Sequence, residues 1–498
     1  MTNNYDILII GAGLGGLQSG AILSKKGFKV CVLEKNKIIG GTLQTFARKG
    51  CDFSTGMHYI GSLDKGQMLH RIFKYFNLFD GIEYKRLNQD AFEIFNIAGK
   101  EYKYAQGFDA WQIQMHAYFP KEKQVIDNYL ARIKAVVDAQ DIYVLKDPEA
   151  NEIQNKDYLH INAFREIQSL TANKELQNAL GALNFVYAGE KDSTPFYIHA
   201  LINNYFINSS YRVVGKSDQI ADSLANTIKQ NGGEVFTGKK AISFVFEGDQ
   251  MTAIETAEGE RFYAKQFISN LHPSVTMDLI EEGRIKKSFR KRMNKLSNTL
   301  SAFGLHLNLK KDAVKYHNFN YSYYKQNDVW YASYYDEKKW PEHYFLHASP
   351  VTANDEYANC VGLLTHMKFE EVAQWAHLPI HRRGQDYKDW KQEKSEKMIA
   401  LVGERFPEIK ENIVAYTAST PLTYRDYIGT HDGSMYGTSR DYRNPMGSYV
   451  SPRTKIPNLF FTGQNLNLHG MLGVSLSTLL TCGEFVPLKQ LIKEVNNA

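Results

Sequence analysis

Residues 5–41 read YDILIIGAGLGGLQSGAILSKKGFKVCVLEKNKIIGG, and this stretch decides the fold. It begins with an unbroken apolar run over residues 7–10, which is typical of a parallel strand buried on both faces. Gly11, Gly13 and Gly16 follow at the spacing G-x-G-x-x-G. The first glycine of this pattern allows a tight turn, the second lets backbone approach a pyrophosphate, and the third lets the next helix pack on the strand. The stretch therefore predicts a dinucleotide-binding unit.

A helix, a second strand and an acidic residue complete this unit. Small and apolar residues over 17–26 predict a close-packed helix whose amino terminus faces the phosphates. Residues 29–33 predict the second strand, and Glu34 follows it 18 residues after Gly16, near the usual spacing of about 20. A carboxylate there hydrogen-bonds a ribose hydroxyl and repels a 2′-phosphate, which favours FAD or NAD over NADP. The residues expected to contact the dinucleotide are Gly11, Gly13, Leu14, Gly15, Gly16, Glu34 and Lys35.

The next segment favours FAD. Residues 35–46, KNKIIGGTLQTF, resemble the second glycine motif of flavoproteins with two dinucleotide-binding domains, where the chain returns along the FAD pyrophosphate. By this resemblance Gly41 and Thr42 contact FAD. Amine oxidases and phytoene desaturases usually have G-G-R here, whereas this chain has Thr42 in place of the arginine.

Three more segments narrow the resemblance. Residues 50–61, GCDFSTGMHYIG, resemble the F-D-T-G-x-H-Y-x-G segment of retinol saturases and their carotenoid isomerase and phytoene desaturase relatives, with Ser54 in place of the aspartate. Residues 421–437, PLTYRDYIGTHDGSMYG, and 459–473, LFFTGQNLNLHGMLG, resemble the closing motifs of that family. The resemblance covers the flavin-binding parts well and the middle of the chain poorly.

The resemblance implies contacts made by the later segments. A strand that begins near Ala241 would lay its backbone against the adenine, and Gly463 and Gln464 would meet the phosphate and ribityl region. Gly473 and Val474, at the start of a predicted apolar helix, would meet the flavin ring. Backbone N–H groups and the helix dipole there would stabilise the negative charge of reduced flavin.

These motifs predict an α/β flavoprotein with a Rossmann-like FAD domain and an interleaved α+β substrate domain. We expect the FAD domain to comprise residues 1–80, 210–274 and 413–498, and the substrate domain to comprise residues 81–209 and 275–412. Periodicity predicts helices over 61–79, 111–138, 161–183 and 386–403, an amphipathic helix within 211–230, and a strand over 300–309.

Two segments in the middle of the chain bear on the substrate. Residues 316–347 are rich in Tyr and Trp, which is typical either of a sheet core with surface tyrosines or of a wall for a long apolar ligand. Residues 138–159 correspond in position to a region that helps desaturases touch membranes.

Composition excludes several classes of protein. The 498 residues are 43% hydrophobic, contain no apolar run long enough to span a bilayer, and enter the first strand without a signal-like region, so we expect a cytoplasmic protein. The four cysteines lack metal-ligand spacing, which predicts reduced structural thiols and no metal site.

The chain has a net charge of +5 and a cluster of basic residues over 284–295. This cluster indicates either a solvated helix face or contact with an anionic membrane surface. Nothing else in the sequence supports nucleic-acid binding.

The candidate catalytic residues are His58, Tyr59 and His469, because their motifs should border the flavin. Each side chain either donates a proton to a carbanion left by hydride transfer or anchors a loop by hydrogen bonding. The sequence contains no H-E-x-x-H, C-x-x-C or G-x-S-x-G motif. The cofactor would therefore supply the redox chemistry.

By resemblance, we expect an FAD-dependent oxidoreductase that reduces, desaturates or isomerises a C=C bond of a retinoid, carotenoid or other apolar polyene. The alternatives are an oxidase similar to amine oxidases and a lipid-binding flavoprotein whose FAD is structural. A second complete G-x-G-x-x-G unit is absent from the sequence, so an external electron donor or acceptor is expected.

Overall fold

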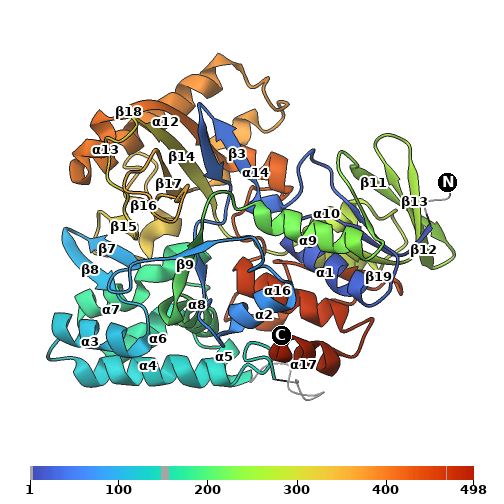
Figure 1. Ribbon diagram of the computed structural model, residues 1–498, viewed down its shortest axis with the longest axis horizontal. Coiled ribbons are helices and arrows are strands. Elements are labelled where there is room, and N and C mark those ends of the chain that lie inside the picture. The colour runs from blue at the N-terminus through green and yellow to red at the C-terminus, as the bar shows by residue number, and fades with distance from the viewer. Residues whose placement is uncertain (1–3, 147–155, 467) are drawn as a thin grey trace.

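The computed structural model describes residues 4–146, 156–466 and 468–498. Two large sheets lie toward opposite ends of the molecule, with helices between and beneath them (Figure 1). We call the one that contains the first strand the dinucleotide sheet. Its strands, in spatial order, are β10 (Glu234–Phe236), β2 (Val30–Leu33), β1 (Asn4–Ile10), β13 (Arg261–Ser269), β12 (Gln250–Thr256) and β11 (Ala241–Glu247), with β19 (Leu459–Phe461) also paired to β13.

The dinucleotide sheet is built from three separate parts of the chain. β1 pairs in parallel with both β2 and β13, and β19 pairs in parallel with β13. Because β1 lies inside the sheet under helices, its apolar run over 7–10 is buried, as parallel strands require. Strands far apart in the sequence thus bring their carboxyl ends to one edge.

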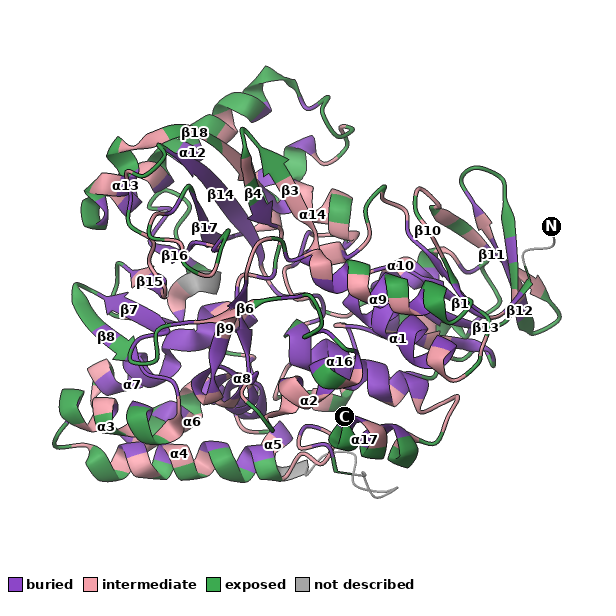
Figure 2. Cartoon of the chain, viewed as in Figure 1, coloured by how far each residue is buried: buried purple, intermediate pink, exposed green. Residues whose placement is uncertain are grey.

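Three helices cover this sheet beside its glycine turn. They are α1 (Leu14–Lys25), α9 (Gln219–Gln230) and α16 (Gly470–Cys482), and α1 packs against the other two. A Cβ on Gly16 would lie 2.1 Å from the Gly11 carbonyl oxygen, so only glycine lets α1 start this close to β1. Figure 2 shows α1 and α16 almost wholly buried, which explains their small and apolar residues.

The second sheet consists mainly of strands from the middle of the chain. In spatial order they are β18 (Ile413–Ser419), β14 (Ser301–Leu309), β17 (Cys360–Met367), β16 (His343–His347), β15 (Asn320–Tyr324), β7 (Glu93–Ile97) and β8 (Lys100–Tyr104). We expected the chain to return to the dinucleotide part at Ile413. Instead β18 pairs with β14 as an edge strand of the second sheet, because its alternating residues cover one face of that sheet. The return to the dinucleotide sheet comes with β19.

Smaller β elements connect the two sheets. β5 (Ile60–Gly61) and β6 (Tyr84–Arg86) both pair with β9 (Ser210–Val213), and β3 (Thr45–Arg48) forms a hairpin with β4 (Cys51–Ser54). β4 lies against β17, where Cys51 Sγ donates to the Asn359 carbonyl at 3.3 Å. A hydrogen bond with the Cys360 thiol lowers the pKa of the Cys51 thiol to about 7. Cys51 and Cys360, which are far apart in the sequence, are therefore neighbours, and both are free thiols.

A helical layer lies under the second sheet (Figure 1). Its helices are α3 (Phe108–Tyr118), α4 (Lys123–Asp138), α5 (Lys156–Leu159), α6 (Ala163–Leu170), α7 (Lys174–Gly181) and α8 (Phe196–Asn208). The single helices expected over 111–138 and 161–183 are each broken, at 119–122 and at 171–173, where Asn173 caps the next helix. The helix expected over 61–79 is shorter, α2 (Met68–Tyr75). Residues 147–155, part of the segment compared with a membrane-contacting region, lie outside the described residues.

The remaining helices lie at the surface or near the chain's carboxyl end. They are α10 (Pro273–Asp278), α11 (Lys287–Asn294), α12 (Gly384–Arg405), α13 (Pro407–Glu411), α14 (Pro421–Ile428), α15 (Pro445–Ser448) and α17 (Leu488–Asn497). None of the helices in the described parts of the chain is long and apolar enough to cross a membrane.

Candidate active site

A cavity opens at the carboxyl ends of β1 and β2, in front of the amino terminus of α1; we call it the dinucleotide cavity. Eleven of the residues expected to bind the cofactor line it: Gly11, Gly13, Leu14, Gly15, Glu34, Lys35, Gly41, Thr42, Ala241, Gln464 and Val474. Gly16 and Gly463 do not line it, and Gly473 lines a neighbouring cavity instead. The strand–turn–helix order explains this convergence, because parallel strands present their carboxyl ends on one side.

Asn270 holds the glycine turn in place, and sequence reasoning did not list it. Its Nδ2 donates to the Gly11 carbonyl at 3.2 Å, and its Oδ1 would lie 2.7 Å from a Cβ on Gly15 and 2.2 Å from one on Gly463. Gly463 also has a φ of +91°, which disfavours any side chain. Gly463 and Gly15 therefore permit close approach to Asn270. The signal was present in the sequence ISNLHP, residues 268–273, which begins with the last two residues of β13.

Glu34 is buried at the end of β2 with a fixed orientation. The Ala12 N–H donates to one carboxylate oxygen and the Asn36 N–H to the other, both at 2.9 Å. These bonds hold an acceptor at the edge of the dinucleotide cavity, where a ribose hydroxyl can donate to it.

Basic side chains surround the same cavity. Burial lowers the pKa of Lys35, whose Nζ donates to the Asp426 carbonyl at 2.9 Å. Lys239, Lys240 and Arg425 also line the cavity and were missed, because they lie outside any glycine motif. Their positive charge is suited to an anionic ligand.

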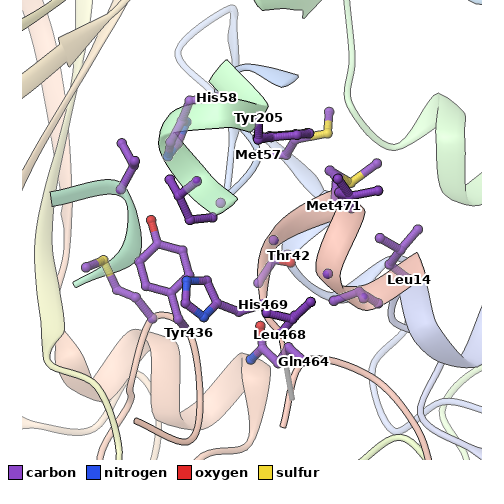
Figure 3. Close-up of a pocket in the computed structure, with 18 of the residues that line it drawn as sticks. Leu14, Thr42, Met57, His58, Tyr205, Tyr436, Gln464, Leu468, His469 and Met471 are labelled. Atoms are coloured by element: carbon purple, nitrogen blue, oxygen red, sulfur yellow. The ribbon is translucent and has the colours of Figure 1, made fainter. Parts of the chain in front are cut away.

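The neighbouring cavity is lined mainly by apolar residues, and we call it the apolar cavity (Figure 3). Its wall comes from α8, β16, β17, the loop before β5 and the first turns of α16. Phe345 and Leu364 of the second sheet take part in it, so the aromatic segment contributes to a cavity wall as well as to a core. The two cavities share the residues Leu14, Thr42, Ile428, Gln464 and Val474.

Two uncapped helix amino termini face these cavities. The N-cap residues Gly13 of α1 and His469 of α16 make no side-chain capping hydrogen bond. The first-turn N–H groups of both helices are thus available to a ligand, together with the positive ends of the helix dipoles. A Cβ on Gly473 would lie 2.6 Å from Leu468 Cβ, so this glycine lets the preceding loop fold against α16.

All three candidate catalytic side chains line the apolar cavity. The centre of the His58 ring lies 3.9 Å from that of the His347 ring, and the centre of the His469 ring lies 4.8 Å from that of the Tyr436 ring. Figure 3 shows the His469 and Tyr436 side chains beside each other. Burial lowers the pKa of each of these two candidate histidines to about 3. Both are therefore neutral near pH 7, and a neutral imidazole is a weak proton donor. Tyr59 stacks on Phe206 at 4.2 Å, and burial raises the pKa of its hydroxyl.

The chain is similar to known proteins in both sequence and fold. Residues 9–76 match the family of NAD(P)-binding Rossmann-like domains. The all-trans-retinol 13,14-reductase of Rattus norvegicus is 27% identical over 95% of this chain and 84% of its own length. A 4,4′-diapophytoene desaturase of a Methylomonas species is 22% identical over 92% and 90%, and the chloroplastic prolycopene isomerase of Daucus carota is 22% identical over 88% and 72%.

Among solved structures, an oxidoreductase from Methanosarcina mazei has a TM-score of 0.62 at 17% identity, covering 95% of this chain and 99% of that one. A putrescine oxidase with redesigned cofactor binding has a TM-score of 0.65 at 14% identity, covering 98% and 99%. The chain therefore shares the α/β fold of these two oxidoreductases, including one Rossmann-like domain. In sequence it resembles the retinol 13,14-reductases and, at lower identity, carotenoid desaturases and isomerases, over most of its length.

Proposed function

We propose that this chain is an FAD-dependent oxidoreductase that reduces, desaturates or isomerises a C=C bond of a retinoid, carotenoid or other apolar polyene. The observation that carries the proposal is the junction of the two cavities, where a polar dinucleotide cavity shares wall residues with an apolar one. The relatives support the substrate class, because their names describe reactions on retinol, diapophytoene and prolycopene.

The residues present fit FAD. A Cβ on Gly13 would lie 3.1 Å from Asn270 Nδ2, so a side chain would fill the space that a pyrophosphate needs next to α1. FAD, when bound, supplies the two-electron chemistry. The α1 amino terminus would hold its pyrophosphate, Glu34 a ribose and Ala241 the adenine. Gly41, Thr42, Gly463 and Gln464 would lie along the phosphates and ribityl chain, and Gly473 and Val474 beside the ring.

The chain's own contribution to the reaction is positioning, electrostatics and exclusion of water. First-turn N–H groups of α16 stabilise negative charge that develops beside them. The apolar wall orients a long, uncharged substrate and keeps bulk water from the reacting carbons.

An oxidase similar to amine oxidases is the second candidate, and the lining argues against it. No Asp or Glu belongs to the described lining of the apolar cavity, so no carboxylate there can pair with a substrate ammonium. A third candidate is a lipid-binding flavoprotein without catalytic activity. One relative, from Danio rerio, is named an inactive all-trans-retinol 13,14-reductase, which favours keeping this candidate.

Two further parts of the proposal concern partners. Electrons are exchanged with an external donor or acceptor. The second partner is a membrane, because an apolar substrate dissolves in lipid. The exposed lysines on and beside α11 would contact an anionic membrane surface.

The test is an anaerobic absorbance experiment on the purified holoprotein, reduced chemically and then mixed with all-trans-retinol. Reoxidation of the flavin together with loss of the retinol band is the result expected for reduction of the double bond. Retinol that survives while oxidised enzyme converts a saturated analogue would indicate desaturation. If neither occurs, and short polyenes are also inert, the lipid-binding candidate replaces this proposal.

A further inference from the structure

We infer that Tyr59 and Glu93 form a proton-transfer pair at the wall of the apolar cavity. In this pair the Tyr59 hydroxyl exchanges a proton with the substrate, and the buried Glu93 carboxyl behind it restores or takes up that proton. The inference rests on the proposed function and adds a residue that does not line either cavity.

Glu93 is unusual because it is a fully buried acid without an ion pair among the described residues. It lies on β7, where Ser322 Oγ donates to one of its carboxylate oxygens at 2.7 Å and Asn320 Nδ2 to the other at 3.1 Å. The buried Arg212 donates to Asn320 Oδ1 at 2.6 Å. Asn320 therefore lies between the guanidinium and the carboxyl, so the positive charge is close without being bonded to the acid.

This environment makes Glu93 a proton carrier near neutral pH. Burial raises the pKa of its carboxyl to about 7, while the bonds from Ser322 and Asn320 and the charge of Arg212 oppose that rise. A carboxyl that holds its proton about half of the time at neutral pH is suited to acid–base catalysis.

Tyr59 is the tyrosine facing Glu93 that also reaches the cavity. The titratable groups that act on Glu93 or feel its charge are Arg212, Tyr59, Tyr104 and Tyr324. The Tyr104 hydroxyl donates to the Ala179 carbonyl and the Tyr324 hydroxyl to the Ala182 carbonyl, so both protons are engaged. The Tyr59 hydroxyl interacts with the Glu93 carboxyl and has no other acceptor among the described residues, and Tyr59 lines the apolar cavity.

A reduction step takes one proton from the pair. The Tyr59 O–H bond breaks as a C–H bond forms on the substrate carbon next to the one that receives hydride. The Glu93 O–H bond then breaks and the Tyr59 O–H bond re-forms. A small polar cavity that includes Ser54, Ser217 and Ser349 also borders Tyr59, and water there can return a proton to the pair. Desaturation uses the same groups in reverse.

The pair can be tested without turnover by infrared spectroscopy of the full-length holoprotein across about pH 5 to 9. We expect a protonated carboxyl band that fades through about pH 7, is missing in Glu93→Gln, and is displaced in Tyr59→Phe. A band that persists in Glu93→Gln, or that Tyr59→Phe leaves unmoved, overturns the inference.

Kinetics then test the role of the pair. For reduction of a polyene, the rate should fall about tenfold per pH unit above pH 7, because Glu93, which must reprotonate Tyr59, has lost its proton there, whereas desaturation should rise through the same pH. Glu93→Gln should be about 100-fold slower and independent of pH, and Glu93→Asp should restore the slope. Tyr205→Phe removes a different cavity hydroxyl, one with no hydrogen-bond partner among the described residues, and should keep the slope whatever its rate. A pH slope that survives in Glu93→Gln overturns the inference. If wild type converts no polyene, the proposed function fails, and the carboxyl titration alone decides whether the pair exists.

Discussion

The proposed cofactor binding depends on the absence of a side chain at Gly13, which lines the dinucleotide cavity. It is the N-cap residue of α1, and a Cβ added to it would lie 3.1 Å from Asn270 Nδ2. Gly13→Glu should reduce the bound flavin of purified protein to about a tenth or less, because an unpaired carboxylate beside a pyrophosphate costs several kcal/mol. Flavin content is measured by absorbance after denaturation. Gln124→Glu, on the exposed surface of α4, places the same charge elsewhere and should retain its flavin; equal flavin content in the two variants would contradict the assignment.

His469 allows a second prediction at the scale of one residue. Because burial lowers its pKa to about 3, it is neutral from about pH 5 to 9 and does not switch protonation there. His469→Phe should retain flavin and slow turnover by about tenfold or less, with the midpoint of the pH–rate profile unmoved. Loss of the midpoint would make His469 the proton donor and would remove that role from Tyr59.

The sequence predicted which residues lie together where they belong to one local motif. Gly11, Gly13 and Glu34 lie within one strand–turn–helix unit, so their spacing alone brings them to one cavity. Asn270 and Glu93 could not be assigned in the same way, because the contacts that define them join positions more than 200 residues apart.

At the scale of elements, the close packing of α1 depends on two glycines with different neighbours. A Cβ on Gly16 would meet a backbone oxygen at 2.1 Å, whereas one on Gly20 would meet the end of the flexible Ile228 side chain at 2.7 Å. Gly16→Ala should therefore destabilise the protein by about 2–4 kcal/mol and reduce its flavin content. Gly20→Ala should change stability by about 1 kcal/mol or less, because Ile228 can move and alanine favours the helix. Thermal melts followed by circular dichroism measure both, and equal melting temperatures would contradict this account of the helix start.

The contact between β4 and β17 gives a prediction about reactivity. Cys51 is partly exposed, and the Cys360 thiol lowers its pKa to about 7, so Cys51 becomes a thiolate above that pH. Alkylation of Cys51 by iodoacetamide, followed by mass spectrometry, should rise with a midpoint near pH 7. Cys360→Ala should move the midpoint toward the usual value of about 8.5. An unmoved midpoint would show that another group lowers the pKa.

At the scale of the whole molecule, the interleaving of two sheets is what creates the junction of the cavities. The apolar cavity draws its wall from residues near 57, 201, 345, 436 and 471. The end motifs predicted the dinucleotide sheet, because its strands carry recognisable turns. The second sheet was harder to predict, because its strands lack such turns, and for this reason β18 was placed with the wrong sheet.

The basic cluster gives a prediction that concerns the molecule as a whole. Within it, Arg290 and Arg292 donate to backbone carbonyls, which leaves Lys286, Lys287, Lys291 and Lys295 exposed on or beside α11. Each lysine near an anionic membrane surface contributes about 1 kcal/mol at low salt. Changing all four to Gln should therefore reduce cosedimentation with vesicles that contain phosphatidylserine by about tenfold or more, and added salt should reduce wild-type binding in the same way.

The matched control for this prediction changes four exposed lysines elsewhere to Gln, namely Lys311, Lys325, Lys338 and Lys339. Both variants lose the same charge, so a general electrostatic attraction would weaken equally in the two. A membrane-facing surface at α11 predicts that only the first variant loses binding, while its turnover of a polyene dissolved in detergent stays at the wild-type rate, because α11 does not line either cavity. Equal losses in the two variants would identify the cluster as a solvated helix face, and substrate would then have to reach the apolar cavity without help from these lysines.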